Sequence, residues 1–147
     1  MQYFEDLIVG SKASFGNYPV TREDVVEFAR KFDPQPFHLS DEAAAETHFG
    51  RLSASGWHTC ALFMRMMFDG WLKESASMGA PGIDRLKWMR PVRPGDVLSG
   101  RSVVVDVRPS RSRPDRGFVH LRHEIVDARG DLVMLLEHPF MVTRRAA

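Results

Sequence analysis

An aspartate and a histidine lie five positions apart in a short segment that contains two prolines. Asp33 and His38 enclose the sequence Pro-Gln-Pro-Phe, and Phe32 precedes the aspartate. Each proline fixes its own φ angle, removes an N–H donor and disfavours the α conformation of the residue before it, so we expect a stiff extended bend. A carboxylate and an imidazole held in this way can position a water molecule and deprotonate it near neutral pH. This pair is the best indication of catalysis in the chain.

The composition is that of one soluble globular domain. The chain has 147 residues, of which 44% are hydrophobic and 27% charged, and its formal net charge is +1. Because domains typically have about 100–200 residues, we expect a single domain over residues 1–147. The small net charge gives no reason to expect nucleic acid or a membrane as a partner. A lone cysteine, Cys60, and a start without the regions of a signal peptide favour a cytoplasmic protein.

The first half of the chain is predicted to be helical. Thr21 and Asp24 resemble a capping box, and apolar residues then recur at helical spacing as far as Phe32. A second, short helix is expected to begin after Ser40 as its N-cap and to end before Gly50. These two helices enclose the segment that carries the aspartate and the histidine.

A third predicted helix, about residues 56–73, is apolar nearly all round. Its few polar side chains share one narrow stripe and are His58, Arg65, Asp69 and Lys73. A helix of this kind is typical of a protein core. The charges in its middle argue against a membrane span.

The second half is predicted to form an antiparallel sheet. Segments rich in β-branched and aromatic residues alternate with turns rich in Pro, Gly and Asp. The predicted strands are residues 83–89, 97–107, 118–127 and 132–142. A sheet that follows one long apolar helix indicates an α+β architecture in which the sheet curls around the helix.

These features together resemble the MaoC-like dehydratases, a family that includes the (R)-specific enoyl-CoA hydratases and adopts the hotdog fold. The resemblance rests on the Asp-Pro-Gln-Pro-Phe-His segment of residues 33–38, the Phe-Gly and Ser-Gly pairs at 49–50 and 55–56, and the Arg-Pro-Val-Arg-Pro-Gly-Asp segment of 90–96. It covers about residues 10–143. It implies a single hotdog fold, with an antiparallel β-sheet wrapped around a long hydrophobic central helix.

The resemblance also implies a reaction and the residues that perform it. Asp33 and His38 would activate one water as it adds to the β-carbon of a 2-enoyl thioester, and the reverse reaction would dehydrate a (R)-3-hydroxyacyl thioester. The backbone N–H of Gly56, at the positive end of the long helix, would stabilise the charge that develops on the thioester oxygen. The side chains expected to contact the substrate are Ser55, Trp57 and Phe37.

This chain departs from the family pattern at three positions. Where the family often has Gly before the aspartate, Asn-Pro on the histidine side and His before the helix glycine, the chain has Phe32, Gln35 and Ser55. The acid/base pair is retained. The changes are expected to reshape the pocket around it.

An arginine-rich segment at residues 108–116 has two interpretations. It is either a solvated hairpin loop or a site for the phosphates of coenzyme A, with Arg111 and Arg113 as ligands, because guanidinium forks suit phosphate. Coenzyme A would enter only as part of an acyl-CoA substrate. No other cofactor is expected.

A metal site is not expected, and a homodimer or higher oligomer is. The remaining histidines lack metal-ligand spacing and are His48, His120, His123 and His138. The family is usually dimeric or higher, and a single hotdog domain has sheet edges that need to be covered.

Other roles and functions remain open. Asp33 and His38 could simply close a turn, and Gly56 could simply begin a helix. A hotdog thioesterase would carry an acidic residue on the central helix, where Asp69 is the candidate. A non-catalytic acyl-thioester-binding subunit is the third possibility.

Overall fold

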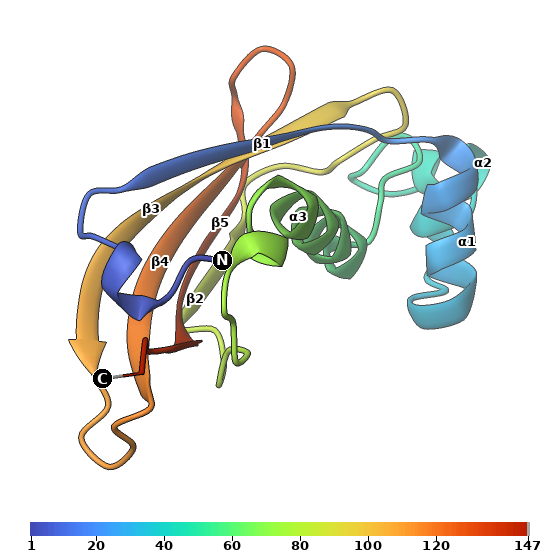
Figure 1. The fold of residues 1–147 in the computed structure, drawn as a ribbon. Coiled ribbons are helices and arrows are strands. Elements are labelled where there is room, and N and C mark those ends of the chain that lie inside the picture. Colours follow the sequence, from blue (N-terminus) through green and yellow to red (C-terminus); the bar gives the residue numbers. More distant parts are fainter. Residues whose placement is uncertain (147) are drawn as a thin grey trace.

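The computed structural model describes residues 1–146 and shows a five-stranded antiparallel sheet that curves around one long helix (Figure 1). The strands lie in the order β1-β3-β4-β5-β2. Their bounds are β1 Lys12–Pro19, β2 Arg85–Trp88, β3 Val97–Pro109, β4 Arg116–Val126 and β5 Leu132–Thr143. The predicted α+β hotdog fold and the four predicted strands are confirmed.

The central helix α3 (Gly56–Gly70) provides the core against the sheet. Its residues Leu62, Phe63, Met66 and Met67 are buried and join one cluster with sheet residues that include Leu98, Ile125, Met134 and Leu136. Burial of such side chains contributes about 1.5–3 kcal/mol each. Among residues 1–146, no helix combines the length and apolar content needed to cross a membrane.

Two details of the prediction for α3 were wrong. The helix ends at Gly70, and Lys73 lies in a following 3-10 turn, Leu72–Glu74. One side of the helix is also uncovered, since Trp57, Met64 and Phe68 are 59%, 45% and 44% exposed. The sheet packs on one side of α3 only. Apolar residues on the opposite side of the helix therefore stay exposed.

The edge strand β1 was not predicted. Its sequence lacks an alternating apolar pattern and includes Gly16 and Pro19, and Phe15 is its one buried residue. Pairing with β3, from Lys12 opposite Val103 to Pro19 opposite Val97, holds the strand in the sheet. An edge strand that is fixed by backbone hydrogen bonds leaves little hydrophobic pattern to detect.

Helices α1 (Arg22–Phe32) and α2 (Asp41–Ala45) lie beyond the N-terminal end of α3 (Figure 1). Both predicted caps are present, because the Thr21 hydroxyl accepts from the Asp24 N–H at 3.2 Å and the Ser40 hydroxyl from the Ala43 N–H at 3.2 Å. Between the helices, the predicted extended bend is only partly correct. Gln35 is extended, but Pro36–His38 forms a 3-10 turn with the proline at its first position.

Candidate active site

Asp33 and His38 face each other at the end of α1. The Asp33 N–H still donates to the Ala29 carbonyl at 2.9 Å, which closes the last turn of the helix. The 3-10 turn that follows Pro34 then brings the imidazole back toward the carboxylate. As a result, Asp33 Oδ2 lies 3.4 Å from His38 Nε2, and both side chains are largely buried.

A backbone carbonyl fixes the tautomer of His38. Its Nδ1 lies 2.7 Å from the Ser53 carbonyl oxygen. Because a carbonyl only accepts, Nδ1 carries the proton, and in the neutral ring Nε2 then presents a lone pair toward Asp33. Two acceptors at this separation suit a water molecule that donates one hydrogen bond to each.

Two side chains hold the Asp33 carboxylate. Ser55 Oγ donates to Oδ2 at 2.7 Å, and Gln35 Nε2 donates to Oδ1 at 2.8 Å. Burial acts to raise the pKa of Asp33, but the hydrogen bonds from Ser55 and Gln35, aided by the charge of His38, outweigh it and lower the pKa. The carboxylate is therefore ionised at neutral pH.

Ser55 links this carboxylate to the start of α3. It is the fully buried N-cap of the helix, and its hydroxyl accepts from the Trp57 N–H at 3.3 Å while donating to Asp33. Replacement of the family's usual histidine thus leaves a donor for Asp33. Ser55 also lines the cleft described below, and its predicted contact with substrate stays a prediction.

Gly56 begins α3, and its N–H makes no hydrogen bond within residues 1–146. The first N–H groups of a helix lack intrahelical acceptors and lie at its positive end, so this donor is free to bind an oxyanion. On the other side of the glycine, a Cβ would overlap the ring of Trp88. Trp88 Nε1 also donates to the Gly56 carbonyl at 3.1 Å.

These residues line one open cleft with a volume of about 620 Å³, a size typical of small-molecule sites. Asp33, His38, Ser55 and Gly56 lie in it together with aromatic walls. The predicted contacts Phe37 and Trp57 are among those walls: Phe37 stacks on Phe49 with centroids 4.7 Å apart, and Trp57 meets Trp88 edge to face at 5.3 Å. Sequence reasoning missed Phe49 and Trp88 as cleft residues, since only their contacts distinguish them.

Arg111 and Arg113 do not line this cleft. They lie in the turn between β3 and β4, at the far end of the sheet from α1 and α2 (Figure 1), where they border a separate surface depression of about 490 Å³. The structure does not bring them to Asp33. Their binding of coenzyme A stays a prediction.

The carboxylate considered for a thioesterase also lies outside the cleft. Asp69 pairs with Arg65 at 2.9 Å on an exposed part of α3. His58, from the same predicted stripe, is buried and stacks on Phe28 with centroids 4.8 Å apart.

Two of the remaining histidines meet in the core. His123 Nε2 lies 2.8 Å from His138 Nε2, and His123 Nδ1 lies 2.6 Å from Ser102 Oγ. Since His138 Nδ1 is 2.9 Å from the Pro139 carbonyl, one direction satisfies every atom: Ser102 donates to His123, which donates to His138, which donates to that carbonyl. Burial, followed by the nearby His138, lowers the pKa of His123 to about 3. Within residues 1–146, no three potential metal ligands gather.

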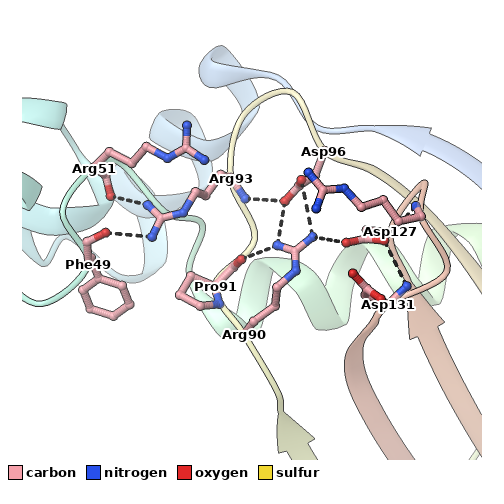
Figure 2. Close-up of polar contacts among 9 residues, drawn as sticks. Phe49, Arg51, Arg90, Pro91, Arg93, Asp96, Asp127 and Asp131 are labelled. Atoms are coloured by element: carbon pink, nitrogen blue, oxygen red, sulfur yellow. Dashed lines mark hydrogen bonds and ion pairs between the residues drawn. The ribbon is translucent and has the colours of Figure 1, made fainter.

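Arg90 lies between two carboxylates at the edge of the cleft. Its Nη1 donates to Asp96 Oδ2 at 3.1 Å and its Nη2 to Asp127 Oδ2 at 2.8 Å (Figure 2). Burial acts to lower the pKa of Arg90, but the hydrogen bonds to Asp96 and Asp127 outweigh it and raise the pKa. The Arg-Pro-Val-Arg-Pro-Gly-Asp segment thus ties the loop before β3 to the turn after β4.

Comparisons with known proteins identify the family of this chain. A family model described as MaoC like domain matches residues 8–123. A 3-hydroxybutyryl-CoA dehydratase of Methylorubrum extorquens is 33% identical over 116 residues, which are 76% of this chain and 69% of that protein. The crystal structure of the MaoC-like dehydratase from Rhodospirillum rubrum matches with a TM-score of 0.92 and 39% identity over 100% of both chains. The (R)-hydratase from A. caviae involved in PHA biosynthesis matches with a TM-score of 0.74 and 26% identity, over 96% of this chain and 99% of that one. The chain therefore belongs to the MaoC-like dehydratase family.

Proposed function

We propose that the protein catalyses the reversible addition of water to a 2-enoyl-CoA, giving a (R)-3-hydroxyacyl-CoA. The observation that carries this proposal is the 3.4 Å separation of Asp33 Oδ2 and His38 Nε2, two acceptors that can share one water. The same cleft holds the free N–H of Gly56. Addition of water to a conjugated thioester needs groups that activate the water and a donor that stabilises the oxyanion, and this cleft holds both kinds of group.

The proposed hydration has two steps. Water donates hydrogen bonds to Asp33 and His38, and its oxygen attacks the β-carbon while one proton passes to the lone pair on His38 Nε2. The π electrons move to the thioester oxygen, which the Gly56 N–H stabilises. The proton is then returned to the α-carbon, so that one water molecule has been added in total.

Asp33 orients the water and stabilises the charged His38. Its lowered pKa makes the carboxylate a weak proton acceptor, so the imidazole is the better base. The imidazolium that forms on proton transfer lies beside the Asp33 carboxylate. Dehydration uses the same groups in reverse.

The names of similar proteins support this reaction class. The Methylorubrum extorquens relative is a 3-hydroxybutyryl-CoA dehydratase, and a structural match is an (R)-hydratase. Another match, 26% identical with a TM-score of 0.74, is a (3R)-hydroxyacyl-ACP dehydratase complex from Mycobacterium tuberculosis. A cytoplasmic location is proposed, in keeping with the free thiol of Cys60.

A homodimer is the proposed assembly. The uncovered stripe of α3 adjoins exposed apolar residues of the segment around β2, since Trp57 meets Trp88 and Met64 lines one depression with Ile83. Among residues 1–146, no strand pairs with the outer edge of β2. The exposed side chains are Trp57, Met64, Phe68, Ile83, Trp88 and Met89. Contiguous apolar surface of this kind marks interaction sites. Sedimentation should give twice the mass of the chain, and Phe68→Glu should shift the protein toward monomer.

The direct test is incubation of purified protein with 2-enoyl-CoAs of several chain lengths. Loss of the conjugated double bond is followed together with release of free thiol. Hydration without thiol release is expected. Thiol release would indicate the thioesterase, which the pairing of Asp69 with Arg65 disfavours. Neither signal, with acyl-CoA binding retained, would indicate a non-catalytic binding subunit.

A further inference from the structure

A second depression adjoins the catalytic cleft. It has a volume of about 450 Å³, and Arg90 and Pro91 line both it and the cleft. Its charged lining residues are Arg51, Arg90, Arg93, Arg129, Asp96, Asp127 and Asp131. We call it the arginine depression.

Two of its three carboxylates are already fully occupied. Both oxygens of Asp96 accept from the Arg90 guanidinium, and Oδ2 also accepts from the Arg93 N–H at 2.9 Å. Asp127 Oδ2 accepts from Arg90, while its Oδ1 accepts from two backbone N–H groups of the following turn. Figure 2 shows these bonds gathered around Arg90. Asp96 and Asp127 therefore neutralise Arg90. Neither carboxylate forms a hydrogen bond with the other guanidinium groups of the depression.

Within the described part of the chain, residues 1–146, the guanidinium groups of the other three arginines contact no carboxylate. Arg93 donates through Nη1 and Nη2 to the carbonyls of Arg51 and Phe49, at 2.8 and 2.7 Å, and these acceptors carry no charge (Figure 2). Arg51 and Arg129 are exposed, and their guanidinium groups form no hydrogen bond or ion pair with residues 1–146. The single lining carboxylate outside the Arg90 network is Asp131. Three guanidinium groups thus surround the depression with one free carboxylate.

Two of these guanidinium groups repel each other. Burial lowers the pKa of Arg93, and the positive charge of Arg51 lowers it further. An anion bound between them would relieve this repulsion. Phosphate is the anion that guanidinium forks match best, because it accepts several parallel N–H bonds and carries more than one charge.

We propose that the arginine depression binds the phosphates of the substrate's coenzyme A or phosphopantetheine arm. This inference rests on the proposed function and extends it to the thiol side of the substrate. An arm that leaves the cleft past Arg90 and Pro91 enters the depression directly. Arg93 lies behind the rim that both share, since its Nη2 bonds the carbonyl of Phe49, a cleft residue.

The test compares thioesters that differ only in their phosphates. Arg51→Gln/Arg129→Gln should raise KM for a 2-enoyl-CoA about tenfold, as expected for loss of charge-assisted hydrogen bonds worth about 1.4 kcal/mol. Its kcat should stay within about twofold of wild type, and KM for the phosphate-free enoyl-pantetheine should not change. Arg93 is left intact because its bonds hold the loop.

Two further comparisons make the result specific. The enoyl thioester of 4′-phosphopantetheine locates the contact: a tenfold effect there assigns it to the 4′-phosphate, and an effect on the CoA ester alone assigns it to the nucleotide phosphates. Arg30→Gln/Arg122→Gln is the matched control: both side chains are exposed and line neither the cleft nor the depression, so KM should not change. An unchanged KM in Arg51→Gln/Arg129→Gln, an equal rise for enoyl-pantetheine, or a rise in the control variant alone would overturn the proposal.

Calorimetry with free coenzyme A separates this proposal from the proposed reaction. If no thioester is hydrated, the hydratase assignment fails, but the arginine depression is still tested by binding. A roughly tenfold weaker affinity in Arg51→Gln/Arg129→Gln supports it. An unchanged affinity contradicts it.

Discussion

Trp88 Nε1 donates to the carbonyl of Gly56 at 3.1 Å, and the indole ring fills the space that a side chain at position 56 would need. The peptide unit that begins α3 is therefore fixed by a tryptophan from the edge strand β2. Packing against Trp88 thus explains why position 56 is a glycine, in addition to the close approach of a ligand. Because the proposed oxyanion donor is the N–H of this residue, Trp88 is a candidate positioning residue for it.

Trp88→Phe should keep most of the ring contact and remove the hydrogen bond. The loosened start of α3 should then hold the Gly56 N–H less well, and we expect kcat for hydration to fall about tenfold, in line with part of one oxyanion-hole contact. Trp71→Phe is the control, because Trp71 lies outside the cleft and its indole nitrogen makes no hydrogen bond within residues 1–146. Equal kcat for Trp88→Phe and wild type would show that the hydrogen bond does not position the donor.

Ser55→Ala should move the pH dependence of the reaction. Without the Ser55 hydroxyl, Asp33 loses one of the donors that keep its pKa low, so its pKa should rise. The proposed mechanism needs both an ionised Asp33 and a neutral His38, so both groups contribute to the acid limb of the kcat/KM profile. The lower-pH part, which is due to protonation of Asp33, should shift to higher pH. The profile against pH distinguishes this from simple damage to the helix cap, which would lower the rate at all pH values.

Acid should destabilise the fold through His123. The unfolded chain protonates this residue near its ordinary pKa of 6.5, whereas the folded protein resists protonation down to about 3. Between these values the unfolded state binds more protons, so the free energy of unfolding falls as pH is lowered, by at most about 1.4 kcal/mol per pH unit, and is flat above this range. Urea midpoints at pH 7 and pH 5 should differ less in His123→Gln than in wild type. His120→Gln is the control and should retain the wild-type difference.

Periodic or capped segments could be predicted from the sequence. The capping residue Thr21 and the apolar spacing that follows defined α1, and the alternating apolar residues defined β3, β4 and β5. The Asp33–His38 pair could be identified because two prolines remove most conformations of the segment between them. Caps, apolar spacing and prolines were sufficient for these segments, because their conformation depends on neighbouring residues in the sequence.

Features that depend on tertiary contacts could not be predicted. Strand β1 is held by pairing with β3, and the role of Trp88 depends on its approach to Gly56 from 32 positions away. The contact between Gln35 and Asp33 likewise gives a function to a residue that departs from the family pattern. The exposed stripe of α3 reflects which side the sheet covers, which the helix sequence alone does not determine.

The hydration rate of a short-chain 2-enoyl-CoA, measured for wild type, Asp33→Asn and His38→Gln, tests the central claim most directly. If the two residues share and activate one water, each substitution should lower kcat by on the order of 10²- to 10⁴-fold with retained fold. The double variant should be little worse than either single one, because both act on the same water. Hydration at the wild-type rate by either single variant would contradict the account.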